Sequence, residues 1–239
     1  MCRLLNPHVN NPFRDPHDSV CAFTGPLPPK LIDVTGPGSR SERKERTRQA
    51  LLDGTLELLD DRSFVSVSLR EVTRAVGIVP TAFYRHFDSM EHLGVNLVEM
   101  STRALRQILR EARRNTNPTI RDFLSIIARE VREHEREFRF ITQERYGGVA
   151  EIRRAIATEL RLFSRELAAE LARIPAMRDW EYDDIEWVAD LGVTAIIAIV
   201  DDLLRADPRN PAEERAAISR GTNQLRVIAL GVAQWKLKG

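Results

Sequence analysis

One segment constrains the fold more than any other: SLREVTRAVGIVPTAFYRHF, in the first half of the chain. Ser68 and Glu71 have the spacing of a capping box, which predicts the start of a helix. Gly77 is the residue type that most often follows a helix end. The segment therefore predicts helices over residues 68–76 and 80–87, joined by a short turn in the proportions of a helix-turn-helix.

The second of these helices has two chemically different faces. Phe83 and Phe87 lie four residues apart on one side, where they would anchor the helix in a small core. The other side carries hydroxyl, guanidinium and imidazole groups, which bond to phosphates and base edges when such a helix lies in the major groove. A solvated face that binds nothing is the alternative, since similar helix pairs occur in many helical proteins. The candidate DNA-contacting residues on this helix are Pro80, Thr81, Tyr84, Arg85 and His86.

The helix predicted before this motif has an excess of cations in its first turns. Ser39 and Glu42 form a second capping-box pattern that predicts its start. Because the whole chain has a formal net charge of only +1, any basic footprint for nucleic acid must be local. Arg43 and Lys44 are therefore candidates for phosphate contacts, and a solvated run of charge is the alternative.

The remaining chain shows helical spacing of apolar residues, and no stretch alternates with the period of two that a strand would show. We therefore predict an all-α fold. A third capping box is expected at Asp88 and Glu91, opening a fourth helix that ends near Arg114. The further predicted helices are 118–133, 138–145, 150–174, 183–206 and 211–238.

The first 38 residues differ in composition from the rest. They hold seven of the twelve prolines and both cysteines, Cys2 and Cys21, and show no helical period. We predict a disordered Pro-rich N-terminal segment over 1–38, either a native tail or the result of a misplaced start. Two cysteines in such a segment indicate neither a disulfide framework nor a zinc site.

The sequence offers little for a membrane protein or an enzyme. The longest apolar run, residues 191–200, is too short to cross a bilayer and predicts a buried helix. No secretory signal pattern is found, so we expect a cytoplasmic protein without membrane association. His134 and Glu135 begin an H-E-x-x-H pattern, but residue 138 is Phe. We therefore predict no catalytic residues, no metal site and no cofactor.

The span from about residue 43 to 100 resembles the DNA-binding domain of TetR-family transcriptional regulators. The resemblance is carried by TRQALLDGTLELL, by SLREVTRAVGIVPTAFYRHF and by its Y-x-H-F ending. It implies an N-terminal three-helix helix-turn-helix DNA-binding domain over 39–100 and a C-terminal helical ligand-binding and dimerisation domain over 101–239. It also implies a base or phosphate contact for Arg70.

The same motif, together with FRFITQER near Phe138, looks like the branch of the family that represses unsaturated fatty-acid synthesis. That branch responds to long-chain acyl thioesters. The resemblance implies a repressor of lipid-metabolism genes whose DNA binding is modulated by a long-chain acyl-CoA. Another hydrophobic small molecule, such as a drug, is the alternative effector. A helical interaction module is the alternative that binds no DNA.

An acyl chain needs an apolar tunnel between helices, which we place between residues 118 and 187. Apolar residues at helical spacing are also what an ordinary core requires, so a simple core is the alternative. The two arginines in this set would meet phosphates of coenzyme A, or would pair with Glu144 and its neighbours. The candidate ligand-binding residues are Phe123, Ile127, Arg139, Phe140, Arg145, Phe163 and Trp187.

The last helix has apolar residues at spacings of three and four, the pattern of a helix–helix seam. From the pattern alone, an intrachain core explains this seam equally well. The family resemblance implies a homodimer built on the last two helices. Twofold symmetry would place two recognition helices about one DNA turn apart on a near-palindromic operator. The candidate dimer residues are Ile196, Ile199, Leu225, Ile228, Val232 and Trp235.

Overall fold

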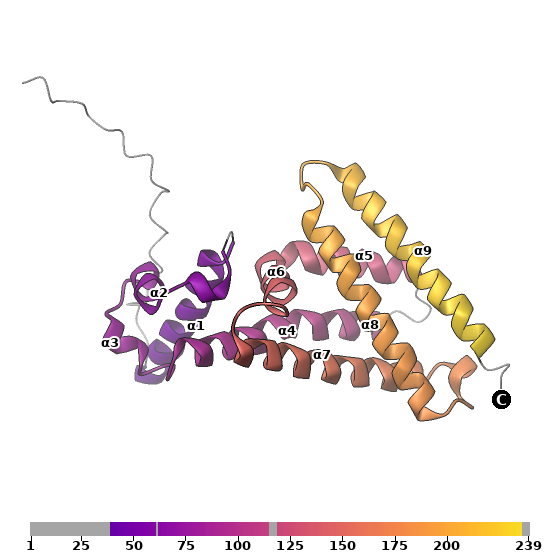
Figure 1. Ribbon diagram of the computed structural model, residues 1–239, viewed down its shortest axis with the longest axis horizontal. Coiled ribbons are helices and arrows are strands. Elements are labelled where there is room, and N and C mark those ends of the chain that lie inside the picture. Colours follow the sequence, from indigo (N-terminus) through magenta and orange to yellow (C-terminus); the bar gives the residue numbers. More distant parts are fainter. Residues whose placement is uncertain (1–38, 61, 115–118, 236–239) are drawn as a thin grey trace, which may run out of the picture. The chain divides into compact units, whose positions relative to one another are not determined.

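The computed structural model describes residues 39–60, 62–114 and 119–235, and all regular secondary structure in these ranges is helical (Figure 1). The all-α prediction is therefore confirmed. The predicted tail 1–38 lies outside the described residues, as do Pro118 and Lys238 at two predicted helix ends. The elements are α1 (Arg40–Leu58), η1 (Phe64–Ser66), α2 (Leu69–Val76), α3 (Pro80–Phe83), α4 (Met90–Arg114), α5 (Ile120–Glu133), α6 (Glu135–Glu144), α7 (Ala150–Leu171), η2 (Pro175–Met177), α8 (Tyr182–Arg205) and α9 (Pro211–Trp235).

Local sequence sets the ends of the first helices as predicted. The capping box of Ser39 opens α1, and the capping box of Ser68 opens α2. Helix α2 ends at Gly77, whose φ of 74° lies in the left-handed region that glycine adopts without steric cost. The Ser68 capping box and Gly77 fix the length of α2 and the direction in which the chain enters the turn before α3.

Several boundaries differ from the prediction: α6 begins at Glu135 rather than at residue 138, and α7 ends at Leu171 rather than at residue 174. Helix α3 ends at Phe83, because the next N–H groups bond three residues back, with Arg85 N to Ala82 O at 3.2 Å. The predicted capping box of Asp88 is wrong: the residue that caps α4 is Ser89, whose Oγ accepts from the His92 N–H at 3.1 Å. The N–H of Asp88 instead donates to the His92 ring at 3.1 Å.

Two large hydrophobic cores hold the helices. The first joins α1, α2, α3 and the start of α4 to residues of α6 and α7, among them Phe140 and Ile152. Gly94 of α4 permits the approach of α7, since a Cβ there would lie 2.4 Å from the Ile152 Cδ1. The second core lies among α4, α5, α7, α8 and α9. The helix-turn-helix therefore shares its core with the helices that follow it.

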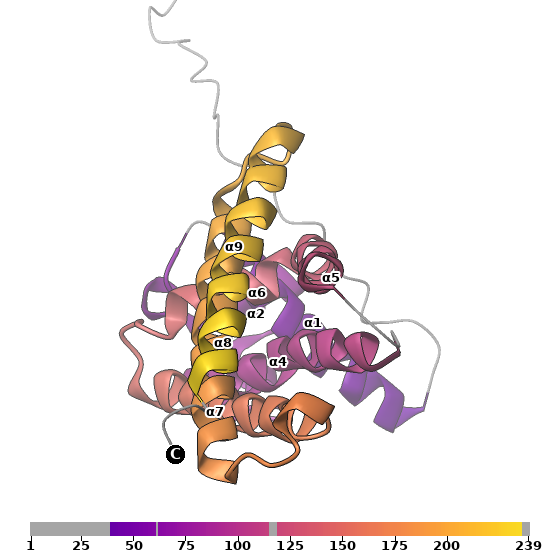
Figure 2. The same ribbon diagram turned by 90° about the vertical axis from the view of Figure 1, so that its right-hand side faces the viewer.

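Helices α8 and α9 pack side by side in both views (Figures 1 and 2). Gly221 of α9 lies against Ile199 of α8, where a Cβ would meet the isoleucine side chain at 2.9 Å. Within the described ranges, no helix combines the length and the apolar character needed to cross a membrane.

Candidate nucleic-acid interface

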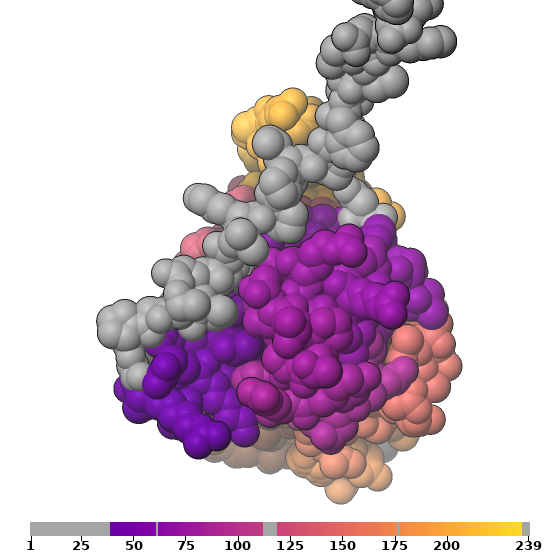
Figure 3. All heavy atoms as spheres, turned by 90° about the vertical axis from the view of Figure 1, so that its left-hand side faces the viewer, coloured from indigo at the N-terminus to yellow at the C-terminus, as the bar shows by residue number. Residues whose placement is uncertain are grey.

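Helix α3 and the turn that follows it, residues 80–87, together have the two faces that the sequence predicted, and both are meant where the faces of α3 are described below. Phe83 and Phe87 are fully buried, at 0% and 1% exposure, whereas Tyr84 is 61% exposed. Thr81 and Arg85 are exposed beside it, and Pro80 is exposed at the helix start. Figure 3 looks onto the side of the molecule formed by α1 to α4, in indigo and purple. The polar side chains of α3 are thus available to an external partner.

The buried face of α3 is fixed from both neighbouring helices. The Phe83 and Phe87 rings lie 5.7 Å apart, and the Arg48 guanidinium of α1 stacks over Phe87 at 5.4 Å. Arg48 also donates a hydrogen bond to the Asn96 side chain of α4. This contact joins α1 and α4 directly behind the recognition helix. Sequence reasoning missed Arg48 as a positioning residue, because its partners lie far from it in the sequence.

His86 lies in the turn after α3 and is partly buried. Its Nδ1 is buried and makes no hydrogen bond within the described structure. Burial lowers the pKa of His86, and the positive charges of Lys44, Arg48 and Arg85 lower it further. The neutral form of the imidazole is therefore favoured, in a cluster of cations whose charge an external phosphate would balance.

The other predicted DNA-contacting cations are also exposed. Arg43 and Lys44 lie in the first turns of α1, and Arg70 lies in the first turn of α2. Within the part of the chain that the structure describes, these three residues and Arg85 form no ion pair. Each guanidinium or ammonium group is free to contact phosphates.

Comparison with known proteins agrees with this geometry. Residues 51–94 match the family model described as bacterial regulatory proteins, tetR family. The matched stretch contains α2 and α3 with the buried Phe83 and Phe87, so the match covers the helix-turn-helix pair.

Solved structures of other proteins share the fold over about three quarters of this chain. A TetR-family regulator, PfmR from Thermus thermophilus, is 19% identical with a TM-score of 0.55, over 74% of this chain and 97% of that one. GusR from Salmonella enterica is 21% identical with a TM-score of 0.57, over 75% and 95%. The fatty acid degradation regulator FadR from Bacillus halodurans is 13% identical with a TM-score of 0.58, over 75% and 94%. At these identities the likeness concerns the fold.

The predicted apolar ligand-binding residues lie in different parts of the described structure. Ile127 and Phe163 are buried in the second core, and Phe123 packs against it. Phe140 belongs to the first core, with its ring 6.4 Å from that of Phe64. Trp187 is 61% exposed on α8. The structure thus separates residues that the sequence pattern had grouped.

The two predicted arginines also lie apart. Arg145 stacks over Tyr146 at 4.7 Å. Arg139 pairs with Glu135 and borders a cleft of about 410 Å³ between α5, the start of α6 and the turn that joins α8 to α9. The apolar lining of this cleft includes Ala128, Val131, Leu203 and Leu204. No motif in the sequence marks it, because segments about 70 residues apart contribute its walls.

The predicted dimer residues fall into two groups. Ile196 and Ile199 are 4% and 1% exposed in the second core, so they serve this chain's own packing. Leu225 packs partly against the same core. Ile228, Val232 and Trp235 of α9 instead line an apolar groove of about 460 Å³ with residues of α8. The exposed apolar residues of these helices are Trp187, Leu191, Val227, Leu230 and Trp235.

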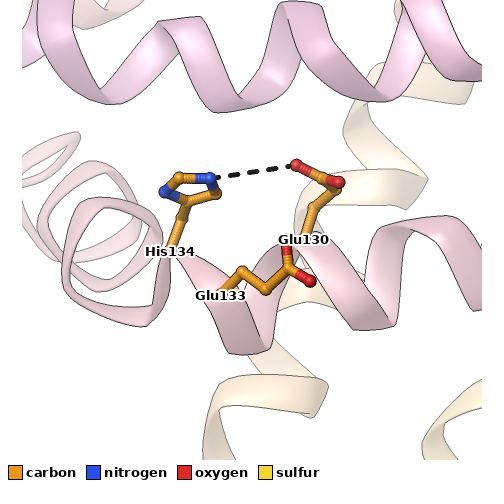
Figure 4. Close-up of side chains that lie close together, drawn as sticks. All are labelled: Glu130, Glu133 and His134. Carbon is orange, nitrogen blue, oxygen red and sulfur yellow. Dashed lines mark ion pairs between the residues drawn. The ribbon is translucent and has the colours of Figure 1, made fainter.

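Three side chains at the end of α5 have the composition of a metal site (Figure 4): Glu130, Glu133 and His134. The His134 Nε2 lies 4.0 Å from a carboxylate oxygen of Glu130, a residue that is only 3% exposed. Arg129 already pairs with Glu130 at 3.0 Å and with Glu133 at 3.9 Å. The guanidinium balances these carboxylates, so the group is better explained as a structural ion-pair network.

Helix α6 contacts the helix-turn-helix part at both of its ends. At its start, Arg136 pairs with Asp60 at 3.0 Å and with Glu57 at 3.5 Å. At its end, the buried Glu144 side chain accepts a hydrogen bond from the Phe64 backbone N–H at 2.8 Å. These bonds connect α6 to the segment between α1 and α2. Sequence analysis did not identify either connection.

Proposed function

We propose that this chain is a DNA-binding transcriptional regulator whose helix α3 enters the major groove of double-stranded DNA. The observation that carries the proposal is the exposed face of α3, fixed from behind by Phe83, Phe87 and Arg48. The tetR family match over the same residues supports it. Hydroxyl and guanidinium groups on this face suit phosphate and base contacts.

A binding measurement tests this proposal. The full chain would be used to select duplexes from a random pool, and affinity would be followed by fluorescence anisotropy as salt rises. A regulator of this kind should lose affinity steeply with salt, because cations displaced from phosphates are released on binding. Failure to enrich any duplex, or an affinity that is independent of salt concentration, would refute the proposal.

One substitution tests the face of α3 directly. Tyr84→Phe removes only a hydroxyl, so if that hydroxyl contacts phosphate, affinity should fall alike on all sequences. Tyr146→Phe is the matched control, because Tyr146 is 78% exposed in the turn after α6. Equal behaviour of the two variants would remove Tyr84 from the interface.

We further propose that the chain forms a homodimer through α8 and α9, and that the dimer binds a near-palindromic operator. The apolar groove lined by Ile228, Val232 and Trp235 supports this, because such a strip is costly to leave in water. Val227→Glu places a charge on the 69%-exposed apolar face and should shift sedimentation equilibrium toward monomer. Ser219→Glu, also exposed on α9, should leave the dimer intact.

We propose that the effector is a hydrophobic molecule, with long-chain acyl-CoA as the first candidate. We propose that the regulatory role is repression of fatty-acid genes. The resemblance of residues 138–145 to the lipid-sensing branch supports it. So does the cleft beside Arg139, which combines an apolar lining with arginines at its border that are each paired with a carboxylate. A drug-like hydrophobic effector is the alternative.

Saturated and unsaturated acyl-CoA would be titrated into the protein–DNA complex. We expect the two to change affinity unequally, since a ligand shifts binding only through different affinity for the two states. Arg139→Ala should weaken the response, whereas Arg154→Ala, an exposed arginine of α7 paired with Glu151, should not. If neither acyl-CoA changes DNA affinity, the acyl-CoA proposal is refuted and other hydrophobic ligands become the candidates.

A further inference from the structure

Val79, the residue immediately before α3, departs from the usual chemistry of a helix start. Ser, Thr, Asp and Asn are preferred there because their side chains bond to the first free N–H groups. Ser68 does so before α2, but Val79 makes no side-chain cap bond. Val149 before α7 also lacks a cap bond, yet it packs against the first core. Val79 is 64% exposed, so packing within this chain does not explain it.

The neighbours of Val79 place it on the outward side of the motif. Ile78 packs against the first core, and Pro80 and Thr81 are exposed. The start of α3 therefore presents an apolar edge, while the cationic and aromatic groups, Tyr84 and Arg85, follow one turn later. Residues at this end of a recognition helix face the base edges.

We propose that Val79 is a specificity-determining residue that contacts the C5-methyl group of a thymine in the major groove. The inference rests on the proposed DNA-binding function. Among the base-pair edges of the major groove, the thymine methyl is the group that an apolar side chain can recognise. Burial of the Val79 methyl groups against the thymine methyl favours thymine over the other bases. In the complex, this burial also offsets the missing helix cap.

The test separates this contact from a structural role. In a duplex selected by the full chain, each thymine is replaced in turn by deoxyuridine, which removes only the C5-methyl group. For the wild-type protein we expect a loss of affinity of about fourfold at one thymine of each half-site, the effect of one methyl group leaving apolar contact. Val79→Ser should bind thymine and deoxyuridine at that position with less than about a twofold difference. Its thermal stability should be equal or higher, because serine caps helices well.

Val65→Ser is the matched control, because Val65 is the same residue type, is 66% exposed, and lies in η1 rather than at the start of α3. It should keep the wild-type pattern of thymine losses. If Val79→Ser also keeps that pattern, or if Val65→Ser abolishes it equally, the inference is refuted while DNA binding stands. If no duplex is selected at all, the proposed function fails and the inference fails with it.

Discussion

Gly147→Ala should destabilise the protein because the new methyl group would displace the Glu144 carboxylate from its hydrogen bond with Phe64. A Cβ at Gly147 would lie 1.9 Å from Oε2 and 2.8 Å from Cδ of Glu144. The carboxylate would have to rotate away, and the hydrogen bond from the Phe64 N–H to Oε1, 2.8 Å long, would break. Phe64 and Glu144 are both 3% exposed, so the N–H would be left buried without an acceptor.

The magnitude follows from that lost bond. A hydrogen bond to a charged group contributes about 1.5–3 kcal/mol. We therefore expect Gly147→Ala to lower the free energy of unfolding by about 2 kcal/mol. For a protein of this size, that corresponds to a fall in Tm of about 4–8 °C. Backbone strain adds nothing, since among the described glycines only Gly77 has a positive φ.

Urea unfolding of four proteins measures the effect: wild type, Gly147→Ala, Glu144→Ala and the double variant. If the cost passes through the Glu144 carboxylate, then Gly147→Ala should cost about 2 kcal/mol less in the Glu144→Ala background than in the wild type. The tight approach of a Cβ to the Glu144 Cα, at 3.1 Å, is present in both backgrounds and cancels.

The adjacent glycine supplies the control. A Cβ at Gly148 would lie 3.5 Å from the nearest atom of Val65, an ordinary contact distance, so Gly148→Ala should be tolerated. The reasoning is wrong if Gly147→Ala and Gly148→Ala are equally mild. It is also wrong if Gly147→Ala costs the same with and without the Glu144 side chain.

Three further predictions concern charge. Phosphates should raise the lowered pKa of His86, so DNA binding should take up a proton and affinity should rise as pH falls. His86→Gln should flatten this rise in anisotropy titrations, and an unchanged rise would contradict the prediction. Hydrogen bonds from the Ser68 N–H and then from Arg62 lower the pKa of Glu71 from 4.5 to about 2. The ionised Glu71 therefore stabilises the fold above pH 4.5, and this stabilisation is lost as pH falls from 4.5 to about 2. Glu71→Gln should therefore reduce the drop in urea midpoint between about pH 5 and pH 2, and an unchanged drop would contradict this. Arg48→Lys keeps the charge but loses planar stacking on Phe87, and should cost about 0.5–1 kcal/mol in urea unfolding, whereas no loss would show the stacking to be unimportant.

The sequence predicted best where structure depends on near neighbours. The capping boxes of Ser39 and Ser68 and the glycine after α2 involve residues three or four positions apart, so local pattern suffices. At Asp88 two adjacent residues could each cap α4, and the pairing of the Asp88 N–H with His92 left that role to Ser89. Pattern alone did not distinguish these two.

The C-terminal residues were harder to predict because α8 is apolar on more than one side. Ile196 and Ile199 face the core of the same chain, whereas Trp187 and Leu191 face outward, and hydrophobic spacing is similar for both sets. The bond between Glu144 and Phe64 joins residues 80 positions apart, so it depends on tertiary packing. The ligand-binding candidates were separated for the same reason.

The core shared by the helix-turn-helix with α6 and α7 has a consequence for exchanging parts between regulators. Cutting the chain near residue 100 would strip Phe140, Ile141, Ile152 and Ile156 from a core in which they are at most 5% exposed. If the helix-turn-helix part were fused to another protein, that protein would need surfaces equivalent to those of α6 and α7 to complete the core. Chimeras that exchange only the outward residues of α3 would keep this core intact, and changes in operator preference are therefore more accessible there than by exchange of whole domains.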